Sequence, residues 1–330
     1  MEAGYKETHI DQILASVLET FNKSAIWDLR HYLTLNNHSR KFLIFSDYCI
    51  DDINKPNDVV TFTIMPHDEY IEDTKTTING FTKKDIKSKS LVESKFLEYM
   101  NEPRFFHISY ILTERRGVTQ IEGLVQRDVV LAMIDNTLKM LDSWIVNTPS
   151  NAEYFKSIKN KLRTSKTAAQ RKSANFKLLR DVITISMLAG VLAFLLTKEG
   201  SAEVVGWFSD RDKIIEVFDG IASDFYGLNH HSLCERSSIN SSRTKLVSAI
   251  PQVDATGKVW YDEINRIPDH IAGTLADLNI DSNSSTRDKF IQVKVDLLAD
   301  NNFCVIFNLK IEKTQNSCGR IIFHKNTPYL

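Results

Sequence analysis

Hydrophobic residues in the first third of the chain change from a helical spacing to continuous runs. Between residues 9 and 35 they recur at intervals of three and four, which is typical of amphipathic helix. Beyond residue 40 they form short apolar runs rich in Val, Ile, Thr and Phe, which favours buried strands. The predicted strands in this part of the chain cover residues 41–48, 59–65, 105–112 and 121–125.

Helical spacing returns in the middle of the chain, and strands and helices then alternate. Helices are predicted over residues 128–145, 152–163, 168–196, 213–226 and 267–278, with one more before the last strands. Strands are predicted over residues 204–208, 258–261, 303–311 and 319–324. The polar stretch 229–242 is predicted to be an irregular loop, and residues 67–90 are polar and ambiguous.

This order of elements predicts an α/β fold with a mixed sheet flanked by helices. Antiparallel strands followed by crossover strands are arranged as in ribonuclease H-like proteins, which is an analogy of topology. We therefore expect an N-terminal helical segment, residues 1–40, followed by a single α/β domain, residues 41–330. A helical insertion is expected within this domain at about residues 67–165.

The composition indicates a globular protein. The chain has 330 residues, a net charge of −1, 42% hydrophobic and 25% charged residues, which is ordinary for a globular protein. Its four cysteines are widely spaced, which favours a reducing, cytoplasmic location over a disulfide framework. The apolar stretch 182–197 is shorter than the roughly 20 residues that span a bilayer, so we expect a buried helix; membrane association through it is a weaker alternative.

Two apolar runs end in the same three residues, which are Phe45-Ser46-Asp47 and Phe208-Ser209-Asp210. Ligand chemistry in open α/β sheets gathers at the carboxyl ends of strands. With Asp212, and with Asp269 on a later helix, these residues form a candidate set of metal ligands. Carboxylates suit Mg²⁺ or Mn²⁺, and paired ions can hydrolyse a phosphodiester. Alternatively, each aspartate acts as a turn or helix-cap residue, which we consider the better assignment for Asp212.

The same three elements resemble the DUF3800 family, whose members are predicted to have a ribonuclease H-like fold. The resemblance lies in Phe45-Ser46-Asp47, in Trp207-Phe208-Ser209-Asp210-Arg211-Asp212 and in Ile267-Pro268-Asp269-His270-Ile271-Ala272-Gly273. The family pattern after the first strand is Asp-Glu-Ser-Gly, whereas this chain has Asp47-Tyr48-Cys49-Ile50, and Pro268 replaces Ala in the late ADxxAG-like helix. The resemblance implies a metal-dependent nuclease-like fold, in a family often found near phage-defence or mobile-element genes.

Residues 156–180 carry nine Lys and Arg residues and no Asp or Glu. A local excess of positive charge is typical of surfaces that bind nucleic-acid backbones, although it also occurs on solvated helix faces. The predicted nucleic-acid contacts are Lys166, Arg171, Lys172 and Lys177.

Other candidate sites are weaker. His230, His231 and Cys234 are too close in sequence for a typical zinc site, and His270 is a possible general base or a surface residue. No phosphate-binding glycine loop or nucleophile elbow occurs in the sequence.

We therefore expect a metal-dependent nuclease acting on DNA or RNA, with Asp47, Asp210 and Asp269 as catalytic residues. The alternative is a catalytically inactive module of the same fold that binds nucleic acid or a protein.

Overall fold

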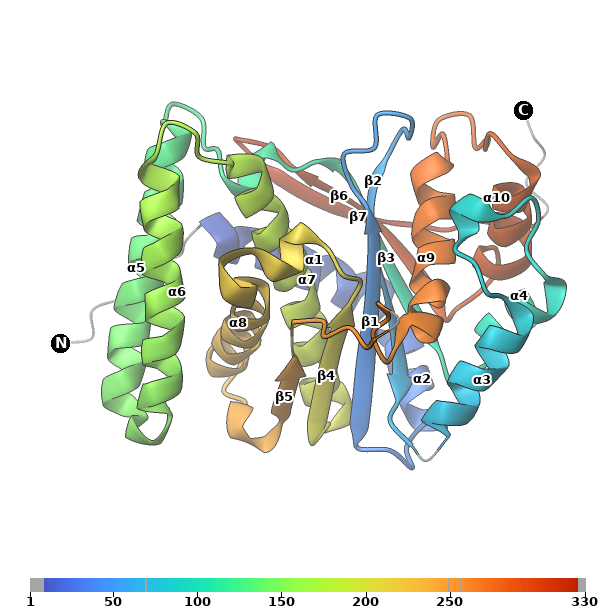
Figure 1. The fold of residues 1–330 in the computed structure, drawn as a ribbon, viewed down its shortest axis with the longest axis horizontal. Coiled ribbons are helices and arrows are strands. Elements are labelled where there is room, and N and C mark those ends of the chain that lie inside the picture. The colour runs from blue at the N-terminus through green and yellow to red at the C-terminus, as the bar shows by residue number, and fades with distance from the viewer. Residues whose placement is uncertain (1–8, 69, 249, 256, 326–330) are drawn as a thin grey trace.

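A mixed β-sheet runs through the centre of the protein, with helices packed on both of its faces (Figure 1). The computed structural model describes residues 9–68, 70–248, 250–255 and 257–325. Within these residues the sheet has seven strands in the order β5-β4-β1-β2-β3-β6-β7. The predicted α/β class, with a mixed sheet flanked by helices, is therefore confirmed.

The sheet is built from an antiparallel meander with parallel strands on each side of it. Strands β1, β2 and β3 form the meander. On one side of it, β4 pairs in parallel with β1, and β5 pairs in parallel with β4. On the other side, β6 pairs in parallel with β3, and β7 pairs antiparallel with β6. Their bounds are Lys41–Cys49 (β1), Asp58–Pro66 (β2), Phe106–Glu114 (β3), Val204–Ser209 (β4), Lys245–Ser248 (β5), Cys304–Ile311 (β6) and Asn316–Ile321 (β7).

Each face of the sheet has its own hydrophobic core. One core packs under α1 (His9–Ser24), α2 (Ile26–Leu35), α7 (Phe176–Gly200) and α8 (Lys213–Arg236), with the hairpin of α5 (Gln126–Asn147) and α6 (Ala152–Gln170) outside α8. The other lies under α3 (Ile71–Phe81), α4 (Ser94–Met100), α9 (Asp262–Asp277) and α10 (Asp288–Val293). The stretch 67–165 thus contains β3 of the central sheet as well as helices.

Residues of β1 alternate between the two cores. Phe42 and Ile44 face the α7 side, whereas Leu43 and Phe45 face the α9 side. Because side chains alternate along a strand, Asp47 also points to the α9 side.

Helix α7 is the central helix of the first core. It is long and apolar enough to cross a membrane, but 83% of its most apolar 18-residue stretch is buried inside the protein. Residues 182–197 are nearly all buried against the sheet and neighbouring helices, so the predicted buried helix is confirmed.

Arg115 joins this core to the end of the β1–β2 hairpin through three carboxylates. Its guanidinium donates to Asp58 at 2.6 Å and to Asp51 at 2.8 Å, and it forms an ion pair with Asp181 of α7. Arg115 and Asp181 are buried, whereas the side chains of Asp51 and Asp58 are 31% and 26% exposed, so the network runs from the core to the surface.

Several predicted boundaries are wrong for identifiable reasons. Residues 121–125 and 258–261 form turns; in the second, Val259 and Tyr261 are buried as anchors of a connection. The predicted helix 168–196 is interrupted, because Asn175 accepts a hydrogen bond from Leu178 N and caps a new helix. In place of the predicted loop 229–242, α8 continues to Arg236, since Leu233 and Cys234 are buried. The predicted strand 319–324 is displaced, because β7 pairs with β6 over Asn316–Ile321.

Helix α9 begins at Asp262, earlier than predicted, because Ile264 and Ile267 are buried in the second core. Pro268 therefore lies inside the helix, and Asp269 is in its middle and does not act as a first-turn residue.

Candidate metal centre

The first two candidate ligands lie side by side on neighbouring strands. β1 and β4 are parallel and in register up to the pair Ser46–Ser209, and Asp210 N donates to Ser46 O at 2.9 Å. Asp47 and Asp210 therefore occupy the next matching positions. Phe45 and Phe208, two residues earlier, both pack in the α9-side core, which places both carboxylates on that side of the sheet.

The third candidate comes from the helix that crosses this face. Helix α9 packs on β1 and β2, and its residue Asp269 accepts a hydrogen bond on Oδ2 from Ile86 N at 2.7 Å. The charge of Asp269 acts on Asp47 more strongly than that of any other carboxylate. The structure thus brings together Asp47, Asp210 and Asp269 from a strand, a strand end and a helix.

Burial and the charges of neighbouring carboxylates raise the pKa of all three. Burial, followed by the charges of Asp269 and Asp210, raises the pKa of Asp47 well above its ordinary range. Burial raises the pKa of Asp269 from 3.8 to about 7, against the lowering effect of the Ile86 N–H. Burial also raises the pKa of Asp210, to which the Asp85 and Asp212 charges contribute. Shifts of this kind concentrate at functional sites.

Asp85 is a fourth carboxylate at this site and was not predicted. Its charge contributes to the raised pKa of Asp47, Asp210 and Asp269. It precedes a short turn, Ile86–Ser88, which the buried Lys289 of α10 holds by donating to the carbonyls of Ile86 at 2.5 Å and Lys89 at 2.9 Å. Residues 82–90 have no hydrophobic periodicity, so only tertiary contacts reveal this placement.

The chemistry of this group of carboxylates fits a divalent cation. Among the described residues, neither Asp47 nor Asp210 forms an ion pair with Lys or Arg, and Asp269 has only the neighbouring His270 ring at 3.5 Å. Lys87, which pairs with Asp85 at 3.5 Å, lowers the pKa of Asp210 and Asp269, but burial and the neighbouring carboxylates outweigh it. Buried like charges without a direct ion pair favour either protonation or a bound metal ion. In the described part of the chain no group of three or more His, Cys, Asp or Glu is already arranged closely enough to hold an ion, so a bound ion would require these side chains to rotate.

The remaining aspartates have structural partners. Asp212 Oδ1 accepts from Ile214 N at 2.9 Å and caps α8, which is the alternative that the sequence favoured for it. Asp277 forms an ion pair with Lys55 at 2.7 Å and accepts from Thr286, and these contacts lower its pKa even though burial opposes them.

Of the candidate histidines, His230 and His270 are buried. His270 is fully buried, its Nδ1 lies 2.7 Å from Arg266 O, and burial lowers its pKa to about 4, so neither a surface role nor that of a base is supported. His230 Nε2 lies 2.9 Å from Thr197 Oγ1, which gives it a structural partner.

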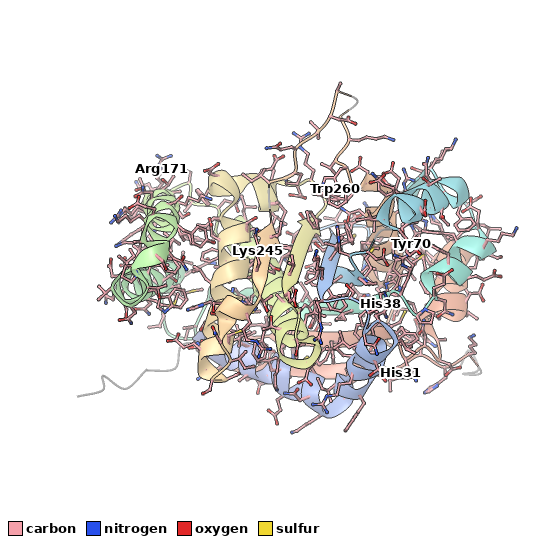
Figure 2. The ribbon with its side chains drawn as sticks, turned by 90° about the horizontal axis from the view of Figure 1, so that it is seen from below. His31, His38, Tyr70, Arg171, Lys245 and Trp260 are labelled. Carbon is pink, nitrogen blue, oxygen red and sulfur yellow. The ribbon has the colours of Figure 1, made fainter. Side chains whose placement is uncertain are left out.

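Much of the basic run is neutralised within the chain. Lys166 pairs with Asp135 at 2.5 Å, and Lys177 pairs with Asp51 at 3.1 Å. Arg171 and Lys172 are exposed in the connection between α6 and α7, where Arg171 is labelled in Figure 2. Lys177 is exposed as well, but it is paired with Asp51, so of the predicted contacts Arg171 and Lys172 are the exposed ones without an ion pair among the described residues.

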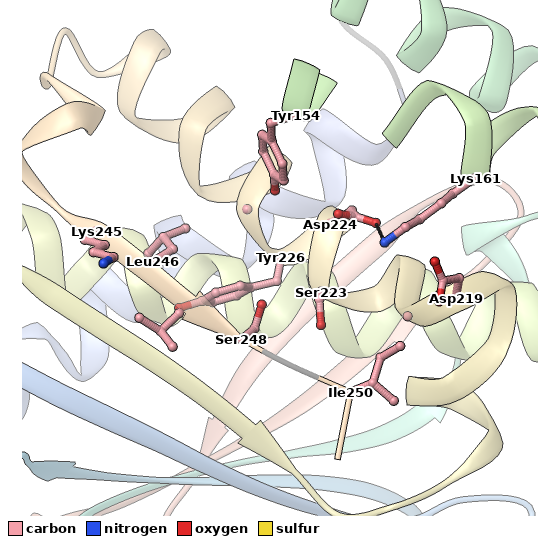
Figure 3. Close-up of a pocket in the computed structure, with 13 residues that line it drawn as sticks. Tyr154, Lys161, Asp219, Ser223, Asp224, Tyr226, Lys245, Leu246, Ser248 and Ile250 are labelled. Carbon is pink, nitrogen blue, oxygen red and sulfur yellow. Dashed lines mark ion pairs between the residues drawn. The ribbon is translucent and has the colours of Figure 1, made fainter. Parts of the chain in front are cut away.

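A separate pocket of about 560 Å³ lies between α6, α8 and β5 (Figure 3). It is crossed by an ion pair between Lys161 and Asp224 at 2.9 Å. Since α6 and α8 cover the α7 side of the sheet, this pocket is on the face opposite the carboxylates. It contains none of Asp47, Asp85, Asp210 and Asp269.

Removing the charge of Asp269 is expected to stabilise the metal-free protein. A carboxylate whose folded pKa is raised binds protons more tightly in the folded state, so its contribution to stability falls as pH rises from about 4 through about 7. We expect Asp269→Asn in EDTA to raise Tm at pH 8 by at least roughly 2 °C, with the difference from wild type vanishing near pH 4. Thermal unfolding across this pH range measures it.

Asp277→Asn is the matched control, because the pKa of Asp277 is lowered and the sign reverses. It should lower Tm at pH 8, with a smaller loss at acid pH. A lower Tm for Asp269→Asn at pH 8 would contradict the assigned electrostatics.

Comparisons with known proteins return no relative. No family model, no curated protein and no solved structure matches the chain.

Proposed function

We propose that this protein is a metal-dependent nuclease that hydrolyses phosphodiester bonds of DNA or RNA with Mg²⁺ or Mn²⁺. The observation that carries the proposal is the meeting of Asp47, Asp210 and Asp269 at one strand edge, where the charge of Asp210 raises the pKa of the other two and none of the three has a Lys or Arg ion pair among the described residues. Asp85 is proposed as a further acidic group of this site.

The topology supports a ribonuclease H-like assignment. An antiparallel meander, two parallel strands beyond β1, and carboxylates on β1, after β4 and on the helix following β5 are the arrangement expected of that fold. The resemblance to the DUF3800 family extends this proposal to a role in phage defence or mobile-element biology, in the cytoplasm.

The proposed division of labour follows from the geometry. Asp47 and Asp210, fixed by strand pairing, would hold the cation on one side, and Asp269 would hold it from the helix. A bound metal ion supplies activation of water and stabilisation of the leaving oxygen. Arg171 and Lys172 are the proposed contacts for the nucleic-acid backbone, because their side chains are exposed and form no ion pair among the described residues.

A catalytically inactive module of the same fold is the second candidate. The observation that favours it is that no metal-binding group is already formed among the residues described. Such a module would bind nucleic acid or a protein without requiring a cation.

Metal binding separates the two candidates. We expect Mn²⁺ at 100 times its Kd to stabilise the wild-type protein by about 2.7 kcal/mol, because an ion that binds only the folded state shifts unfolding by mass action. In a protein of 330 residues this is a Tm increase of roughly 4 °C. Differential scanning fluorimetry with increasing Mn²⁺ measures it, and Asp210→Asn should show little of the shift. Equal shifts in both proteins would place the ion elsewhere, and no shift in either would favour the inactive module.

A further inference from the structure

An exposed aromatic ring lies beside the carboxylates. Trp260 is 45% exposed, and its ring centroid lies 5.0 Å from that of Phe208 and 6.4 Å from that of Phe45. It is on the connection that leads into α9, and it is labelled in Figure 2. Phe45 and Phe208 are the residues two positions before Asp47 and Asp210, so the indole packs against the same two strand ends that carry the acids.

The two phenylalanines on which this ring packs lie one strand repeat before the acidic residues. Two residues of a strand span about 6.6 Å, which is the step from Phe45 to Asp47 and from Phe208 to Asp210. The neighbouring Tyr261 fixes the connection by donating from its hydroxyl to Ser209 O at 2.8 Å. Trp260 is therefore held next to the acids by buried contacts while a large part of its surface stays open.

A second and independent feature is the side chain of Asn265. It is 6% exposed, and among the described residues neither its Nδ2 nor its Oδ1 has a hydrogen-bond partner. Asn265 and Asp269 are four residues apart on α9, so they lie one above the other on the same flank of the helix. A buried amide without partners is costly, and a ligand that supplies a donor and an acceptor would offset that cost once neighbouring side chains move to expose the amide.

We propose that Trp260 and Asn265 form a subsite for an unpaired nucleobase, so that the substrate of the carboxylate centre is a single strand. Trp260 stacks on the base, and the amide of Asn265 hydrogen-bonds its edge. Aromatic side chains bind single-stranded nucleic acid in this way because every base has a stacking face. A base within a duplex is already stacked and paired, so it does not occupy this subsite. The inference rests on the proposed nuclease function.

Binding to a short single-stranded oligonucleotide tests the subsite. In an Asp210→Asn background, which blocks turnover, Trp260→Ala is expected to weaken affinity in fluorescence anisotropy by about 10-fold, within the range that stacking of one base contributes. Trp260→Phe should restore most of the affinity, because it keeps an aromatic face. Trp27→Ala is the matched control, since Trp27 is 74% exposed on α2, away from the acids, and it should leave affinity unchanged.

The substitution Asn265→Leu distinguishes a loss of oligonucleotide affinity from a loss of folding stability. It replaces an unsatisfied buried amide by an apolar group of similar size, so Tm should hold or rise while affinity falls several-fold. The effect of Trp260→Ala should disappear with an oligonucleotide that lacks bases and with a duplex. Equal affinity of Trp260→Ala and Trp27→Ala for the single strand, or the same loss with the abasic strand, overturns the subsite.

The subsite and the nuclease function can fail separately. Metal-dependent cleavage by wild type, with no effect of Trp260→Ala on affinity, overturns the subsite and leaves the nuclease. Affinity that depends on Trp260, in a protein that neither binds Mn²⁺ nor cleaves, supports the subsite and overturns the nuclease.

Discussion

Replacement of Asp210 by Asn is expected to lower metal-dependent phosphodiester cleavage by on the order of 10³-fold, which corresponds to about 4 kcal/mol of lost transition-state stabilisation. The physical reason is that Asn keeps the size and one oxygen of the side chain but removes the negative charge that the cation requires. The backbone of Asp210 is fixed by its hydrogen bond to Ser46 O, so the strand pairing should persist. Cleavage of a labelled oligonucleotide in Mg²⁺ and in Mn²⁺ measures the loss.

Asp212→Asn is the matched control for this experiment. The Asp212 side chain caps α8 through Ile214 N, and Asn caps a helix about as well as Asp. Cleavage by this variant should stay close to wild type. Retained cleavage in Asp210→Asn, or equal losses in both variants, would exclude Asp210 as a ligand.

Replacement of Arg115 by Met is expected to produce the largest loss of folding free energy, about 3–5 kcal/mol. Arg115 compensates Asp51, Asp58 and Asp181, and removal of the guanidinium leaves these carboxylates at the hairpin end with far less positive charge. Asp181 shows the cost of burial, which already raises its pKa although Arg115 opposes the shift. Urea unfolding monitored by circular dichroism measures the change.

Arg116→Met is the control for Arg115, because it alters the adjacent residue and the same kind of side chain. The side chain of Arg116 is 62% exposed and pairs with Glu114, so its removal should change stability by at most about 1 kcal/mol. Similar losses in the two variants would show that the Arg115 network contributes little beyond a surface ion pair.

The strand ends of the site were predictable from sequence, whereas the groups that complete it were not. Asp47 and Asp210 each follow an apolar run, and such runs become neighbouring buried strands for which hydrophobic burial sets the register. Asp85 follows a polar segment whose position depends on Lys289 of α10, a contact between residues far apart in the chain. The amide of Asn265 is likewise unremarkable until its burial is known.

The errors in the secondary structure have the same origin. Short stretches such as 258–261 have strand-like composition, but their apolar residues serve as anchors of a turn. Polar residues near the end of α8 suggested a loop, although His230 is buried against Thr197. Local composition cannot distinguish these cases, because burial by distant elements decides them.

Because α9 supplies Asp269 to a sheet that begins with β1, the acidic group is divided between an early and a late part of the chain. During synthesis, Asp47 and Asp210 leave the ribosome before α9 exists, and domains of this size fold as units once their distant segments are available. A nascent chain that has reached only β5 therefore has two of the three proposed ligands and no helix across them. If the proposed nuclease function holds, cleavage begins only after α9 has been made and has packed on β1 and β2, so a chain that stops before α9 is inactive.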